Sequence, residues 1–117
     1  MRDDKAFLQD ILERITLTET FVKDGKEGFF SSRIAQEAVI RNLEVIGEAC
    51  RAISEDFKTA HPEVPWREIS AFRDFVIHVY WSINLERIWQ IIDQDLIPLK
   101  TEVTKSLNSM DDNEESG

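Results

Sequence analysis

Helix-breaking residues are rare in this chain and fall where helix boundaries are expected. Its 117 residues include four glycines and three prolines. Between them, apolar residues recur at the three- and four-residue spacing of amphipathic helices. No internal repeat and no alternation typical of a strand interrupts this pattern. The sequence therefore predicts an all-α fold: an antiparallel bundle of four main helices with one or two additional short helices.

Capping residues and prolines set the expected helix ends. We expect long helices over roughly residues 3–23, 32–53, 65–81 and 84–107, with a short helical turn after Ser54. The candidate N-caps are Asp3 or Asp4, Ser31 or Ser32, Ser54, and Ser82 or Asn84. The inner face of the second helix is expected to carry Ile34, Ala38, Val39, Leu43, Ile46, Cys50 and Ile53. Gly25 and Gly28 break the chain after the first helix, and Pro98 should kink or split the last one near residues 94–97.

Length and charge limit the classes of protein that the chain can represent. A chain of this size can bury a core of its own, so we expect a single helical-bundle domain over residues 1–107. Residues 108–117 are small, acidic and non-aromatic, which predicts a disordered acidic tail. The net charge of −9 argues against a protein that grips nucleic acid over its whole surface. Any contact with nucleic acid must be local.

The sequence gives little support for a cofactor, a metal or a membrane. Cys50 has no second cysteine to pair with and is expected to be a small buried residue of a cytoplasmic protein. The longest apolar stretch, residues 75–81, is interrupted by His78 and is too short for a membrane span. No paired cysteines, His-x-x-x-His pattern or glycine-rich phosphate loop occurs, and His61 is expected to be structural.

Residues 71–81 form the segment with the most chemical content. On a helical wheel, the side expected to face the core carries Phe72, Phe75, Val76 and Val79, and the opposite side carries Arg73, Asp74, Ile77, His78 and Trp81. Charged residues mixed with large apolar ones indicate a surface that something covers. The same helix of a second copy is the most economical cover, which places Ile77 and Trp81 in a homodimer interface. The alternative is that these two residues contact another helix of the same chain.

This segment carries the groups that cleavage of an RNA phosphodiester requires. His78 can act as acid or base near neutral pH. Arg73 can hold a phosphate through two hydrogen bonds and stabilise its developing charge, and Asp74 can orient either group. Other interpretations remain open: a structural His78, a simple Asp74–His78 surface pair, and a core position for Tyr80 with its hydroxyl at the rim.

The pattern Arg73-x4-His78-x-Tyr80 resembles the signature of the HEPN superfamily, specifically the HepT-like ribonuclease toxins. Two further segments resemble the family in the same order: residues 38–49, AVIRNLEVIGEA, and residues 61–69, HPEVPWREI. The resemblance extends over roughly residues 3–105. The motif alone is moderately specific, and with both flanking segments it is strong.

The resemblance implies a homodimeric all-α bundle that acts as a metal-independent endoribonuclease, with Arg73 and His78 of both copies lining the cleft. Its products would be a 2′,3′-cyclic phosphate and a 5′-hydroxyl. It also implies the toxin of a toxin–antitoxin pair, acting on RNA and not DNA. The antitoxin would be a minimal nucleotidyltransferase that silences the toxin by transferring AMP to Tyr80. Family members often have asparagine where this chain has Asp74.

A different class of function remains as an alternative. The protein can instead be a non-catalytic bundle that partners a nucleotidyltransferase, which the acidic surface and Asp74 favour slightly. Arginines that could extend an RNA path are Arg33, Arg41, Arg51 and Arg67. Each has glutamates nearby in the sequence, so ordinary ion pairs on helix surfaces are the simpler interpretation.

Overall fold

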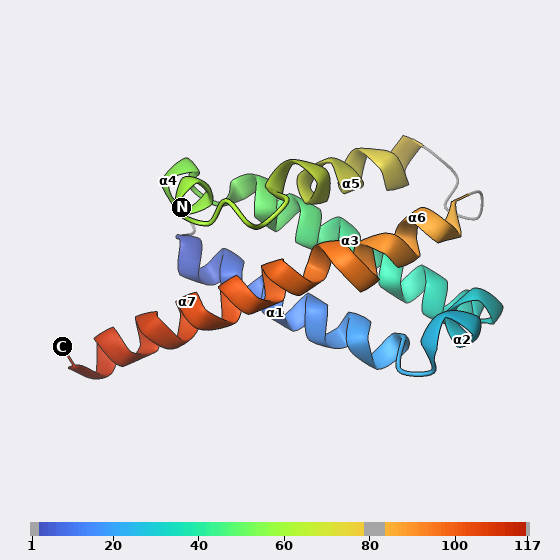
Figure 1. The fold of residues 1–117 in the computed structure, drawn as a ribbon, viewed down its shortest axis with the longest axis horizontal. Helices are drawn as coiled ribbons and strands as arrows, with labels where there is room; N and C mark the ends of the chain where they lie inside the picture. The colour runs from blue at the N-terminus through green and yellow to red at the C-terminus, as the bar shows by residue number, and fades with distance from the viewer. Residues whose placement is uncertain (1–2, 79–83, 117) are drawn as a thin grey trace.

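The molecule is an antiparallel helical bundle, which confirms the predicted all-α class. The computed structural model describes residues 3–78 and 84–116, with side chains described for residues 3–72 and 84–111. Its elements are α1 (Asp4–Phe21), α2 (Gly25–Ser31), α3 (Arg33–Ala52), α4 (Glu55–Ala60), α5 (Trp66–His78), α6 (Leu85–Gln90), the π-helical segment η2 (Ile91–Asp95) and α7 (Leu96–Ser116). The described residues contain no strand. Helix α3 packs against both α1 and α5, and α1 also packs against α7 (Figure 1).

Side-chain caps begin the helices where the sequence predicts them. The caps and the backbone N–H groups that they accept from are Asp3 with Ala6, Ser32 with Ala35, Ser54 with Phe57, and Asn84 with Arg87. Asp4 adds a tertiary link, because its carboxylate accepts the backbone N–H of Ser54 at 3.0 Å and the Ser54 hydroxyl at 2.6 Å. The start of α1 is therefore fixed to the start of α4.

The core follows the apolar stripes of the long helices. Its buried members include Leu8, Ile11 and Ile15 from α1, Val39, Leu43, Ile46 and Cys50 from α3, Ile69 and Phe72 from α5, and Ile88, Ile91, Leu99 and Val103 from the C-terminal half. Helix α3 is the central element, since the helices on either side bury their apolar faces against it. Its packing positions the first half of α5.

Truncating a buried side chain of α3 should destabilise the protein strongly. We expect Ile46→Ala to lower the free energy of unfolding by about 2–5 kcal/mol, because Ile46 is completely buried and leaves a cavity. Urea denaturation followed by circular dichroism measures the change. The matched control is Ile34→Ala on the same helix, whose side chain is 76% exposed, and its effect should stay within about 0.5 kcal/mol. Equal losses in both variants would contradict this assignment of the core.

Two local predictions between α1 and α3 are wrong. Ile34 lies outside the core, because the helical register that buries Ala35 and Val39 turns Ile34 toward solvent. Gly28 is inside the short helix α2, where the sequence predicted only a break. That helical turn buries Phe29 beside Trp89 of α6, with ring centroids 5.7 Å apart. A Cβ at Gly28 would lie 2.7 Å from the Cβ of Asp24, so the turn requires glycine.

The predicted interruption before Pro98 is confirmed. Residues Ile91–Asp95 form the π-helical segment η2, and α7 begins directly after it. Proline has no N–H to donate to the carbonyl four residues earlier, and its ring crowds that carbonyl. The wider π turn accommodates this position while Ile91, Leu96 and Leu99 all remain buried.

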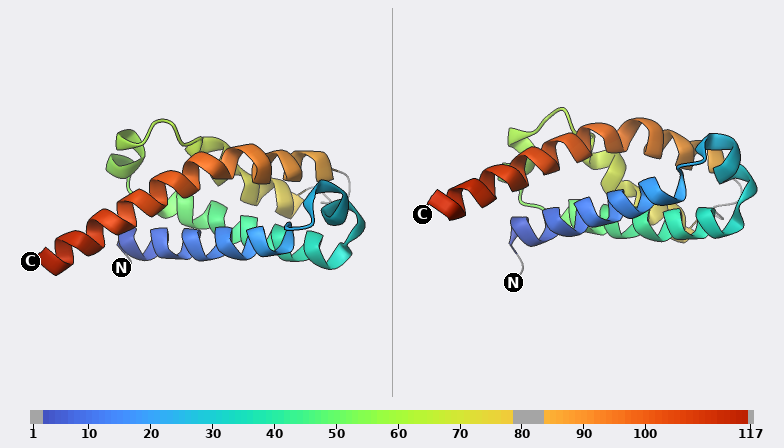
Figure 2. Two further views of the ribbon diagram at one scale, coloured as in Figure 1. Left: turned by 60° about the horizontal axis from the view of Figure 1, so that its bottom comes forward. Right: turned by 90° about the horizontal axis from the view of Figure 1, so that it is seen from below.

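Helix α7 continues to Ser116, so the structure has helical backbone where the sequence predicted a disordered tail. Figure 2 shows this end of the helix extending past the start of α1. Met110 packs against the edge of the core, and the Asp111 carboxylate lies 3.4 Å from the Lys5 ammonium of α1. These contacts tie the helix to the bundle beyond residue 107. Within the described residues, no helix is long and apolar enough to span a membrane.

Candidate functional site

Helix α5 carries the residues with the most chemical content. Its bounds, Trp66–His78, place Arg73, Asp74, Ile77 and His78 on one uninterrupted helix, as predicted. The structure describes these four residues by their backbone alone. Tyr80 and Trp81 lie outside the described residues, so the positions predicted for modification and for the dimer interface remain predictions.

The first half of α5 is anchored on several sides. Ile69 and Phe72 are buried against α3. The Trp66 indole N–H donates to the carbonyl of His61 at 2.9 Å, and the Arg51 guanidinium lies 3.5 Å from the carbonyl of Ser70. A helix fixed in this way presents its second half in a defined register.

His61 has the structural role that the sequence predicts. Its ring stacks on Phe57 with centroids 4.1 Å apart, and its Nδ1 lies 2.8 Å from the Phe57 carbonyl. On the other edge, Nε2 lies 3.5 Å from the hydroxyl of Ser106 and 3.8 Å from the carboxylate of Glu102. These contacts join the loop before α5 to α7.

Charged residues surround a cavity of about 280 Å³ between α5 and α6. Its lining includes Arg67 and Glu68 from α5 and Arg87 from α6. Arg87 lies 3.6 Å from the carboxylate of Asp95 in η2. Partial burial raises the pKa of Asp95, Arg87 opposes this shift, and Glu68 adds to it. The acids and bases here nearly balance, so this cavity concentrates little charge of either sign.

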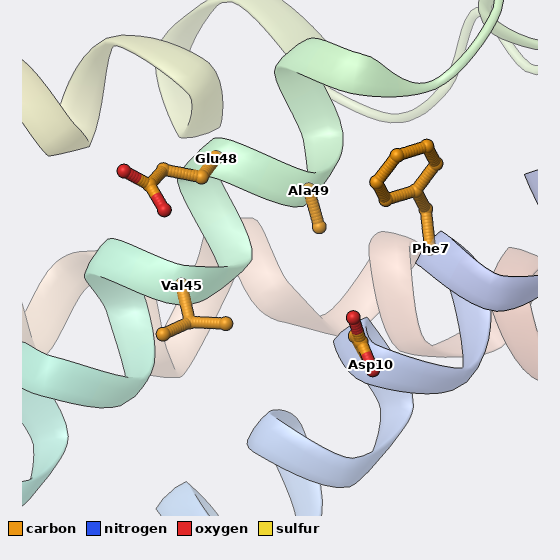
Figure 3. Close-up of a pocket in the computed structure, with 5 residues that line it drawn as sticks. All are labelled: Phe7, Asp10, Val45, Glu48 and Ala49. Carbon is orange, nitrogen blue, oxygen red and sulfur yellow. The ribbon is translucent and has the colours of Figure 1, made fainter. Parts of the chain in front are cut away.

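A second cavity, of about 150 Å³, lies between α1 and α3 and has acidic walls. Phe7 of α1 lies near Ala49 of α3, and Asp10 is directed into the space between the two helices (Figure 3). Val45 and Glu48 complete the lining. The ionisable groups of its described lining are two carboxylates.

The sequence names Arg51 and Arg67 among arginines that could extend an RNA path, but it does not predict that they share a cavity with Lys58. Arg51, Lys58 and Arg67 converge on one cavity at the end of the bundle where α4 lies. From the sequence, ordinary ion pairs were the simpler interpretation of Arg51 and Arg67. Arg41 does form such a pair, because its guanidinium lies 3.4 Å from the carboxylate of Glu44. No ion pair of Arg67 occurs among the residues whose side chains the structure describes. The convergence of Arg51, Lys58 and Arg67 depends on tertiary packing, so no spacing in the sequence predicts it.

The described metal-ligating side chains are dispersed. In the part of the chain that the structure describes, no three His, Cys, Asp or Glu side chains gather closely enough to hold a metal ion. Cys50 is completely buried in the core. Burial raises the pKa of its thiol to about 12, with a smaller opposing effect from Lys58, so the thiol stays protonated and unreactive.

Cys50 should also make stability depend on alkaline pH. Its pKa is raised in the folded state from an ordinary value near 9 to about 12, so the unfolded chain loses this proton first and stability falls as pH rises above about 9. Between pH 8 and pH 10, wild type should lose about 1.4 kcal/mol more stability than Cys50→Ala. Urea denaturation at both pH values measures the difference. Parallel losses in the two proteins would contradict a buried, protonated thiol.

The antiparallel all-α bundle is consistent with the HEPN fold that the sequence predicts. The chain belongs to the HepT-like ribonuclease family: the family model described as "Ribonuclease HepT-like" matches residues 11–106. The resemblance stated from the sequence is thereby confirmed.

Curated relatives agree with this assignment. The chain is 42% identical over 105 residues to the "Probable ribonuclease HepT" of Thermococcus cleftensis, covering 89% of this chain and 96% of that protein. It is 37% identical over 113 residues to a protein of Methanocaldococcus jannaschii named "Gamma-glutamylcyclotransferase and putative RNase". That match covers 96% of this chain and 51% of the relative, so the chain spans about half of that protein. No solved structure matches the chain.

Proposed function

We propose that the protein is a metal-independent endoribonuclease and the cytoplasmic toxin of a toxin–antitoxin pair. One observation carries the proposal: a chain of a ribonuclease family places Arg73 and His78 five positions apart on one anchored helix, α5. The relative named as a probable ribonuclease supports the same activity.

Each group has a defined part in the proposed reaction. The ribose 2′-oxygen attacks the adjacent phosphorus and gives its proton to one His78, while the bond from phosphorus to the 5′-oxygen breaks. The leaving 5′-oxygen takes a proton from the His78 of the second copy. Arg73 holds the phosphoryl oxygens and stabilises their growing negative charge, and Asp74 positions one of these groups. The products are a 2′,3′-cyclic phosphate and a 5′-hydroxyl.

The proposed site requires two copies of the chain. One His78 is the base and the other is the acid, so the cleft forms where the two α5 helices meet. Ile77 and Trp81 share the helical face of Arg73 and His78 in the sequence, which supports a dimer interface that they fill. A covered face of this kind keeps water away from the reacting phosphate and strengthens the charge contacts inside.

Neutralisation is proposed to occur by AMPylation of Tyr80. A minimal nucleotidyltransferase would bring ATP so that the Tyr80 oxygen attacks the α-phosphorus and pyrophosphate leaves. Tyr80 and Arg73 are seven positions apart, nearly two helical turns, so a helix would align them. An adenylate on Tyr80 then brings phosphate to Arg73 and competes with RNA.

The alternative function is a non-catalytic partner of the nucleotidyltransferase. The net charge of −9 and the acidic Asp74 beside Arg73 favour it, since both weaken the attraction for RNA. It predicts a stable complex of the two proteins with no cleavage of RNA.

A cleavage assay distinguishes the nuclease from the non-catalytic partner. The protein is purified without its partner and incubated with total RNA in the presence of a chelator. The proposal expects RNA fragments with wild type and far fewer with Arg73→Ala. Intact RNA with both proteins, together with a stable complex with the nucleotidyltransferase, would reject the nuclease and support the alternative. Gel filtration of the same preparation measures whether the protein is a dimer.

A further inference from the structure

A cavity of about 450 Å³ opens where α3, α4 and α5 meet. Its lining residues are Arg51, Glu55, Lys58, Trp66, Arg67 and Ser70. In Figure 1 the end of α3, the short helix α4 and the start of α5 come together at the end of the bundle where α1 begins. The residues that α5 is described as contributing to this lining, Trp66, Arg67 and Ser70, lie in its first half, and Arg73 and His78 lie in its second half.

The charge of this cavity is opposite to that of the chain. Among the described lining residues three are basic and one, Glu55, is acidic, whereas the whole chain has a net charge of −9. The described lining of the cavity between α1 and α3 has the reverse composition, with Asp10 and Glu48 as its ionisable groups. A local concentration of cations on an acidic protein is the feature expected of a site for an anion.

Intramolecular contacts hold two of the cations in place. The Lys58 ammonium donates to the carbonyl of Arg51 at 3.2 Å, and the Arg51 guanidinium donates to the carbonyl of Ser70 at 3.5 Å. Both carbonyls are neutral, so these two hydrogen bonds position the cations without bringing a negative charge to them. Positioned cations lose less side-chain entropy when an anion binds.

The other two charged residues of the described lining, Glu55 and Arg67, do not neutralise each other or block the binding of an anion. Glu55 is 3.6 Å from Lys58, but its side chain is 88% exposed, so solvent screens this pair. Arg67 is exposed and makes no hydrogen bond or ion pair with any of the described side chains or backbone groups. Its five N–H donors are therefore available for a phosphate.

The register of α5 connects this cavity to the proposed catalytic residues. Arg67 and His78 are eleven residues apart, which returns to nearly the same side of a helix and spans about 16 Å along its axis. An RNA strand bound along this side would reach from one to the other within a few nucleotides.

We propose that this cavity binds a backbone phosphate of the RNA substrate, a few nucleotides from the bond that is cleaved. Arg67 contacts the phosphate, Arg51 and Lys58 supply the surrounding positive field, and Trp66 offers an aromatic surface to the neighbouring base. This inference rests on the proposed function, because it names how the substrate of that activity is held.

Fluorescence anisotropy with a labelled 20-nucleotide single-stranded RNA tests the inference, with His78→Ala as the background that keeps the RNA intact. Adding Arg67→Gln should weaken binding about fivefold and reduce the steepness of log K against log salt by about 0.7, the value for one lost phosphate contact. Adding Glu55→Gln should instead tighten binding, because it removes a negative charge from the cavity lining. Arg41→Gln is the matched control: it makes the same charge change as Arg67→Gln but lies outside the cavity.

The outcomes separate this inference from the proposed function. Wild type that cleaves RNA, with Arg67→Gln and Arg41→Gln equally weak in binding, overturns the phosphate site alone. A wild type that neither binds nor cleaves RNA overturns both. Loss of binding to the nucleotidyltransferase in Arg67→Gln, with RNA binding unchanged, assigns the cavity to the protein partner and also overturns the inference.

Discussion

His78→Ala is expected to slow RNA cleavage by about 100- to 10,000-fold, the usual cost of losing a general acid or base. The loss should be large because the proposed cleft uses this imidazole from both copies, one for each proton transfer. A time course of fragment formation from a labelled RNA measures the rate. Because the residue lies near the end of α5, the variant should unfold at nearly the wild-type temperature.

The other histidine provides the matched control. His61 stacks on Phe57 and contacts Ser106 and Glu102, so His61→Ala should lower the melting temperature while the protein that remains folded still cleaves RNA. His78→Ala should therefore lose cleavage and keep its stability, whereas His61→Ala should lose stability and keep cleavage. Equal cleavage by His78→Ala and wild type would remove this residue from the mechanism.

Tyr80→Phe should abolish the proposed AMPylation completely. Phenylalanine keeps the ring and lacks the oxygen that attacks ATP, so the variant should still cleave RNA but escape the nucleotidyltransferase. Intact-mass spectrometry after co-expression should show AMP additions on wild type and none on Tyr80→Phe. Cells that express the variant together with the nucleotidyltransferase should remain arrested.

A control separates loss of modification from loss of binding. Pull-down of the nucleotidyltransferase by Tyr80→Phe should succeed as it does with wild type, since a single oxygen is removed. AMP additions that persist in Tyr80→Phe would place the modification on another residue and contradict the assignment.

The starts of the long helices were predictable from the sequence because capping chemistry is local. The side chains of Ser32 and Asn84 each accept a hydrogen bond from the backbone N–H three residues later. This pattern involves only neighbouring residues, so the sequence alone predicts it. The interruption before Pro98 is equally local, because a missing N–H disrupts its own turn. The motif on α5 was predictable for the same reason: helical spacing alone relates Arg73 to His78.

Features that depend on how helices meet were not predictable. The short helix α2 forms because Phe29 reaches Trp89, sixty residues away, and no local signal at Gly28 reports that contact. The basic cavity combines Arg51 with Arg67 from different helices, and in the sequence each is surrounded by glutamates. The charges next to a residue in the sequence do not report which side chains it meets in the fold, because tertiary packing decides which side chains share a cavity.

The ends of the RNA products test the central claim most directly. Wild-type protein should be incubated with a defined RNA in a chelator, and the fragments analysed by mass spectrometry. Attack by the 2′-oxygen, with Arg73 and His78 as the acting groups, predicts fragments that end in a 2′,3′-cyclic phosphate and begin with a 5′-hydroxyl. Fragments with 5′-phosphate ends, or no fragments until a divalent metal is added, would contradict the account.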